Sequence, residues 1–245
     1  MIVLGYGLAV LIGITLGLLG GGGAILTVPV LVYVLGVGVR QAVPMSLVVV
    51  GLTSLVGVLQ HSRGRNVNGR ALVAFAPAAI AGSVLGSMLA LRVSARLQLT
   101  IFAVVLLVAA GSMLWGARKA PAPPRAARPL SLLAGIGGGV GLLTGLVGVG
   151  GGFLYVPSLA TLAGLDMKQA VGTSLALITV SCAAGVVGYL GRVPIDWRIV
   201  AGFSGLAFVG VGIGAALVPK VSQATLRRWF AGLLLIMGVL VLIRR

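Results

Sequence analysis

The chain has 245 residues, of which 59% are hydrophobic, 40 are glycine and only 8% are charged. A chain this apolar cannot cover its surface with polar groups, which excludes a water-soluble globular protein. Its 18 Lys and Arg against two acidic residues give a net charge of +16. The basic residues lie between apolar runs, as the flanks of membrane helices do, so nucleic acid is not an expected partner. The composition predicts an all-α integral membrane protein.

Long runs without charged residues predict where the membrane helices lie. A helix needs about 20 residues to cross roughly 30 Å of hydrocarbon. The second helix of each half has only about 13 residues, so it is expected to be short, broken or re-entrant. In chain order, the expected helices span roughly 3–19, 24–36, 42–60, 71–91 and 97–115, and then 131–147, 152–164, 170–190, 198–218 and 226–243.

The chain contains two copies of one unit. An offset of 128 residues aligns the halves without a gap and gives 15 identities in the 42 positions from residue 20 to residue 61. We therefore expect a first transmembrane repeat at 1–115, a Pro- and Ala-rich cytoplasmic linker at 116–130 and a second transmembrane repeat at 131–245. One set of aligned glycines has the small-xxx-small spacing of close helix packing: Gly82 and Gly86 with Gly210 and Gly214.

The number of crossings per repeat determines how the repeats are oriented. Five crossings, or three crossings and a re-entrant hairpin, make an inverted pair, whereas four crossings make a parallel pair. Counting basic residues does not distinguish these models, although both place the linker and residues 61–70 in the cytoplasm. The odd number of segments favours inverted repeats with both termini on the outer face.

Two glycine-rich motifs stand at matching positions in the most apolar regions: "GGGGAILTVP" at 20–29 and "GVGGGFLYVP" at 148–157. Broken helix at membrane depth persists only when it is buried in protein or lines a polar cavity. Glycines ahead of a new helix expose amide N–H groups at its positive end, which attracts anions. Such breaks form the midplane site of many transporters, although glycines also permit tight helix crossings. Pro29 and Pro157 are expected to mark the helix breaks.

The candidate substrate-binding set combines both glycine motifs with polar residues nearby. Serine and threonine in membrane helices often bond their own backbone, and the two glutamines either bind substrate or brace the broken helices. The set is Gly21, Gly22, Gly23, Gly150, Gly151, Gly152, Gln41, Gln169, Ser46, Thr173 and Ser174. His61, the only histidine, and Tyr189 at its matching position are candidates for proton coupling, with an ordinary interfacial role as the alternative.

The remaining chemistry is sparse. Asp166 and Asp196, the only acids, occupy positions typical of helix N-caps, so no carboxylate is expected at the membrane centre to bind sodium or relay protons. One histidine and two capping acids supply no base or metal cluster for an enzyme, and Cys182 has no second cysteine. We expect no enzyme, metal or cofactor. A structural membrane subunit and a passive anion channel remain alternatives to a transporter.

Both glycine motifs are followed by a basic residue and "QAV", and then by "SL". With these doubled motifs the chain resembles the TauE/SafE family of sulfite and organosulfonate exporters, also called TSUP permeases, over nearly its whole length. The resemblance implies a multi-pass carrier in a bacterial or archaeal inner membrane, with sulfite, an organosulfonate or a related small organic anion as substrate.

Overall fold

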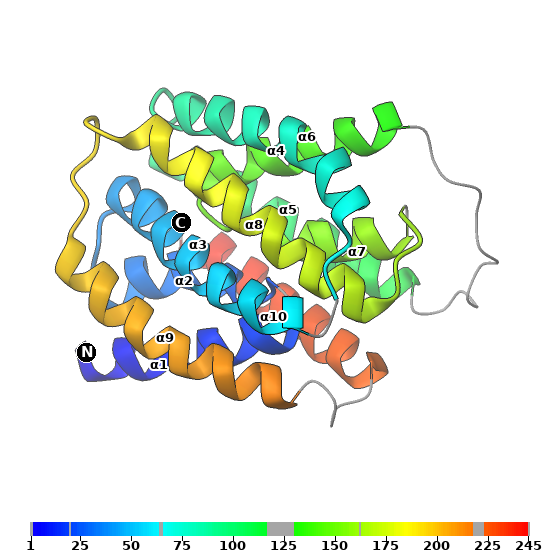
Figure 1. Cartoon of the computed structure of the whole chain (residues 1–245). Coiled ribbons are helices and arrows are strands. Elements are labelled where there is room, and N and C mark those ends of the chain that lie inside the picture. Colours follow the sequence, from blue (N-terminus) through cyan, green and yellow to red (C-terminus); the bar gives the residue numbers. More distant parts are fainter. Residues whose placement is uncertain are drawn as a thin grey trace.

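The computed structural model describes residues 2–19, 21–63, 66–116, 130–161, 163–217 and 223–244, which form helices and connecting turns without strands (Figure 1). The predicted all-helical fold is confirmed. Residues 117–129, most of the predicted linker, lie outside this description. The elements are α1 (Ile2–Leu19), α2 (Ala24–Pro29), the π-helix η1 (Val30–Val34), α3 (Val39–Arg63), α4 (Gly69–Ala90), α5 (Ala95–Gly116), α6 (Leu130–Val147), α7 (Gly152–Thr161), α8 (Met167–Tyr189), α9 (Trp197–Leu217) and α10 (Gln223–Arg244).

Four helices in the described part of the chain are long and apolar enough to cross a membrane. They are α3 over Val39–Ser62, α4, α8 over Lys168–Tyr189, and α9. Shorter apolar segments lie in α1, in α2 with η1, in α5, in α6 and in α10. These helices give the bundle enough apolar length to be a membrane protein.

Helices α3 and α8 form the centre of the bundle and run antiparallel. Gly57 of α3 faces Leu175 of α8, while Gly51, earlier in α3, faces Cys182, later in α8. The two helices occupy matching positions of the repeats, since Val39 plus 128 gives Met167. Matching helices with opposite directions are the relation that an inverted repeat requires.

The bundle has two ends that differ in the elements they hold. At the linker end, α5 stops at Gly116 and α6 begins at Leu130. The starts of α4 and α8 also meet at this end, because the backbone N–H of Asn68 donates to Thr173 Oγ1 of α8 at 2.9 Å. At the other end, which we call the terminal end, α4 and α8 stop together, because Gly188 lies against Ser87. Figure 1 shows that α1 begins and α10 ends at the terminal end, opposite the linker end.

The first two segments of each half form a hairpin. Leu35, directly after η1, lies against Gly5 near the start of α1, so this hairpin begins and finishes at the terminal end. In the second half, Gly137 of α6 packs on Phe75 near the start of α4, and α8 begins at that same linker end. Three helices then follow the hairpin in each half, which is the order of elements in the re-entrant alternative. The number of membrane crossings per repeat stays a prediction.

The halves are neighbours in sequence but share one core in space. The most extensive helix contacts join α4 to α6, α1 to α9, α3 to α8, α4 to α8 and α5 to α10. All of these pairs combine an element of one half with an element of the other. Glycines permit the closest crossings: a Cβ at Gly82 or Gly86 would overlap the α6 backbone, and one at Gly210 or Gly214 would overlap the α1 backbone.

We predict that topology reporters fused at residue 245 and within residues 117–129 report opposite sides of the membrane. The linker should be cytoplasmic, because the basic residues around it favour that side, and the antiparallel α3 and α8 then put the termini outside. Phosphatase and fluorescent-protein fusions at both sites measure this. Reports from the same side would contradict the inverted arrangement.

Candidate functional site

The two glycine breaks contact each other directly. A Cβ built on Gly21 would lie 2.5 Å from the Cα of Gly152, and a Cβ on Gly152 would lie 2.5 Å from the Cα of Gly21. Ile178 of α8 touches both residues. Gly150 and Gly151 have φ values of 70° and 66°, which residues with a Cβ rarely adopt. Glycine is therefore required here both for close approach and for backbone conformation.

This contact lies near the middle of the two central helices. Gly150 faces Val50 of α3 and Ile178 of α8, and each of these residues stands about halfway along a helix that is long enough to span the membrane. Ala24, the first residue of α2, also faces Gly150. The breaks of the two repeats therefore meet at mid-depth, where unpaired backbone groups are most costly.

The backbone donors at the breaks are buried and lack an acceptor among the residues that the structure describes. The carbonyls of Gly21, Gly22 and Gly23 accept hydrogen bonds from the next helical turn at 3.1–3.4 Å, and the Gly151 carbonyl accepts from the N–H of Leu154 at 3.0 Å. Within the described residues, no acceptor is found for the amide N–H groups of Gly22, Gly23, Gly150 and Gly151, although all four residues are buried. Open donors at helix starts in an apolar region are suited to binding an anion.

The breaks are closely packed in this conformation. A cavity of about 10 Å³ adjoins the glycine break of the second repeat, which we call the second break. It is lined by Phe102, Val105, Leu143, Thr144, Val147, Val149, Gly151 and Phe153. That volume holds about one water molecule. An anion larger than water can reach the open amides only if the two breaks separate.

Side-chain hydrogen bonds attach the second break to its surroundings. Ser46 of α3 donates to the carbonyl of Gly148 at 2.6 Å, and Tyr189 of α8 donates to the carbonyl of Gly145 at 2.8 Å. Gln98 Nε2 of α5 donates to the carbonyl of Leu146 at 3.2 Å. The α6–α7 hairpin is thus attached to three different helices.

The sequence analysis missed two residues that anchor this hairpin, Tyr155 and Gln98. Tyr155 of α7 shares a hydrogen bond of 2.9 Å with Ser181 of α8, and Gln98 joins Leu146 to the end of α4 at Ala90. The repeat could not reveal either residue, because Thr27 stands where the second copy has Tyr155 and Leu226 stands where the first copy has Gln98. The sequence signal for both residues is a polar side chain in an otherwise apolar segment.

Several predicted site residues lie away from the breaks. Gln41 is exposed at the start of α3, at the terminal end, whereas Gln169 lies in the first turn of α8, at the linker end. Thr173 accepts the hydrogen bond from Asn68, and Ser174 donates to the carbonyl of Val171 in its own helix. The structure therefore brings together the glycines and Ser46, but not the two glutamines.

His61 and Tyr189 also occupy opposite ends. His61 lies near the end of α3, at the linker end, and is partly exposed. Tyr189 is buried at the end of α8, where its hydroxyl binds Gly145. The matching positions therefore make different contacts, and a role for either residue in proton coupling stays a prediction.

Pro157 does not end its helix, contrary to our expectation, whereas the α-helix α2 ends at Pro29. Pro157 lies inside α7, which continues to Thr161, and Pro29 is followed directly by the π-helix η1. Proline removes one N–H donor from the helical ladder but fits the helical φ angle, so a helix can continue around it. The chain breaks at the glycines before each proline.

Both acids cap helices, as predicted. The Asp166 carboxylate accepts from the N–H of Gln169 at 2.9 Å at the start of α8. The Asp196 carboxylate accepts from the N–H groups of Arg198 and Ile199 at the start of α9. Both are exposed at the ends of the bundle, so neither carboxylate is near the open amides.

A helical membrane bundle with broken hairpins that meet at mid-depth is the architecture of many secondary transporters. The chain matches the family described as Sulfite exporter TauE/SafE over residues 6–241, and it belongs to that family. A probable membrane transporter protein of Xylella fastidiosa strain 9a5c is 30% identical over 87% of this chain and 84% of its own length. Two similarly named proteins, from Haemophilus influenzae and Methanocaldococcus jannaschii, are 25% and 26% identical over at least 93% of both chains. No solved structure matches. Together, the family and these relatives support a membrane transporter.

We predict that Gly152→Ala destabilises the protein and Gly139→Ala does not. The added methyl at residue 152 would press on Gly21 and force the breaks apart, which costs about 1 to 3 kcal/mol. Gly139 of α6 has no neighbour within 4 Å of the new Cβ, and alanine favours helix by about 1 kcal/mol. Thermal unfolding in detergent measures both variants. Equal unfolding midpoints would show that the contact between the breaks is unimportant for stability.

Proposed function

We propose that this protein is a secondary transporter that exports sulfite, an organosulfonate or a related small anion across the inner membrane. The anion binds between the two repeats, at the amide N–H groups that precede α2 and α7. The observation that carries this proposal is the pair of glycine breaks at mid-depth, whose buried N–H donors have no acceptor within the described part of the chain. Membership of the TauE/SafE family supports the anionic substrate class.

The charge distribution also supports an anion. Asp166 and Asp196 are the only acids in the sequence, and both are capping residues at the ends of the bundle. No carboxylate therefore opposes the positive ends of α2 and α7 or offers a site for a cation. Backbone donors can hold sulfite without a basic side chain nearby.

Transport requires the closed contact between Gly21 and Gly152 to open. The α6–α7 hairpin is attached by Ser46, Gln98 and Tyr189, and two of these positions lack an equivalent in the other repeat, where Leu226 and His61 stand instead. We propose that the α1–α2 hairpin moves against the anchored second hairpin. Its movement exposes the amides first to one side of the membrane and then to the other.

We predict that the purified chain alone carries sulfur oxyanions into liposomes. Uptake of labelled sulfite should saturate and should accelerate when sulfite is already inside, because a carrier exchanges bound substrate. An organic cation such as choline should not accumulate, since the site offers only donors. Liposomes without protein provide the control. Flux without saturation or counterflow would indicate a channel, and no flux would favour a structural subunit.

We also predict that substrate protects the break amides from hydrogen exchange. Saturating sulfite should slow exchange in peptides covering 21–26 and 148–155, because each N–H gains an acceptor in the bound state. Peptides from the exposed turn at residues 190–196 serve as the internal control and should not change. Mass spectrometry of the detergent-purified protein measures exchange with and without the anion. Protection elsewhere, with none at the breaks, would place the anion site outside the glycines.

A further inference from the structure

The terminal end carries an open cavity that is separate from the glycine breaks. Its volume is about 340 Å³, and its lining combines two arginines with four apolar side chains: Leu85, Met88, Leu89, Leu91, Arg92 and Arg192. The residues come from the last turns of α4, the turn after it, and the turn between α8 and α9. None of them belongs to the substrate site proposed above.

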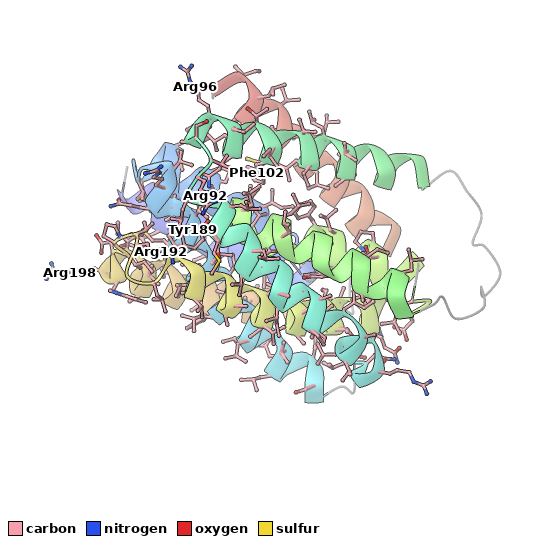
Figure 2. All side chains as sticks on the ribbon, turned by 90° about the horizontal axis from the view of Figure 1, so that it is seen from above. Arg92, Arg96, Phe102, Tyr189, Arg192 and Arg198 are labelled. Carbon is pink, nitrogen blue, oxygen red and sulfur yellow. The ribbon has the colours of Figure 1, made fainter. Side chains whose placement is uncertain are left out.

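Both arginines are fixed in position by their backbone. The N–H of Arg92 donates to the carbonyl of Leu89 at 2.9 Å, and the N–H of Arg192 donates to the carbonyl of Tyr189 at 3.0 Å. These turns close directly after α4 and α8. In Figure 2, Arg92 and Arg192 lie near each other and near Tyr189, whereas Arg96 and Arg198 point outward from the bundle.

The two guanidinium groups have no carboxylate partner within the described residues. Asp196, which lies in the same turn as Arg192, binds the backbone of Arg198 and Ile199 instead. Asp166 lies at the linker end. Two positive charges thus face a shared cavity with no negative charge to balance them, which favours an anionic ligand.

The cavity lies at the depth where phospholipid headgroups meet acyl chains. Helices α4 and α8 are both long and apolar enough to span the membrane, and the arginines follow their last residues, Ala90 and Tyr189, by two or three positions. Arginine at such a place is at the level of lipid phosphates. Below it, toward the membrane centre, Leu85, Met88 and Leu89 are 56%, 44% and 45% exposed, so they face acyl chains.

We propose that this cavity binds one anionic phospholipid. Arg92 and Arg192 together hold its phosphate, and an acyl chain lies along Leu85, Met88 and Leu89. A free inorganic anion would satisfy the arginines but would gain nothing from the exposed apolar wall. A lipid satisfies both parts of the lining, because its phosphate can accept from both arginines while its acyl chain covers the exposed apolar wall.

The test uses the full-length protein, purified in detergent and stripped of lipid. Thermal unfolding is followed during titration with dioctanoyl phosphatidylglycerol, with dioctanoyl phosphatidylcholine, or with inorganic phosphate. The anionic lipid should raise the unfolding midpoint, while the zwitterionic lipid and phosphate should have much smaller effects. The double variant Arg92→Gln/Arg192→Gln should bind phosphatidylglycerol about thirtyfold more weakly, as expected from the loss of two arginine–lipid interactions.

A matched control removes the same charge from the same end. The variant Arg96→Gln/Arg198→Gln loses two arginines outside the cavity and should bind the lipid as the unaltered protein does. Arg92→Lys/Arg192→Lys keeps the charge and should retain most of the binding, which also shows that the positions tolerate substitution. Equal weakening by both glutamine pairs would overturn the proposal in favour of a general electrostatic effect. Equal stabilisation by phosphatidylcholine or by inorganic phosphate would also overturn it.

Discussion

The structure depends on the need to shield backbone N–H groups that have no hydrogen-bond acceptor from the apolar environment of the membrane. Inside hydrocarbon an unpaired amide is expensive, yet this chain interrupts a helix at mid-depth in each repeat. It shields the interruptions by packing them against each other, with Gly21 on Gly152. Ile178 of the central helix α8 lies against both glycines of this contact, and Val50 of α3 lies against the neighbouring Gly150. The same burial that protects the amides from lipid also leaves their donors open, which is why we propose them as the binding site for an anion.

Burial of the breaks also explains why the halves cannot be separate domains. Each hairpin needs the other half to cover it, so α6 packs on α4 and α1 packs on α9. These crossings are close because small residues face backbone, as Gly82 does against α6 and Gly210 against α1. Because the helices of each repeat pack mainly on helices of the other repeat, the two homologous halves share their hydrophobic core.

The repeats have diverged in how firmly their hairpins are held. Tyr155 binds Ser181 through its hydroxyl, whereas the matching Thr27 is buried with no hydrogen-bond partner for its hydroxyl in the described structure. Tyr189 likewise holds Gly145, while the matching His61 lies partly exposed near the end of α3. Pseudo-symmetry therefore places a hairpin at matching positions of both repeats, and individual substitutions give the second hairpin hydrogen bonds at positions where the first repeat has Thr27 and His61.

The sequence by itself determined the membrane class, the ten helical segments, the two repeats and the capping roles of Asp166 and Asp196. These features depend on composition, periodicity and local hydrogen bonding, which are properties of neighbouring residues. Only the tertiary structure decided that Gly21 meets Gly152, that Gln41 and Gln169 lie at opposite ends, and that α7 continues through Pro157. Gln98 shows the reason: its partner Leu146 is distant in the chain, and the repeat pattern gives no guide to such a contact. Long-range contacts of this kind follow from how helices of both halves cross, and no local pattern records that geometry.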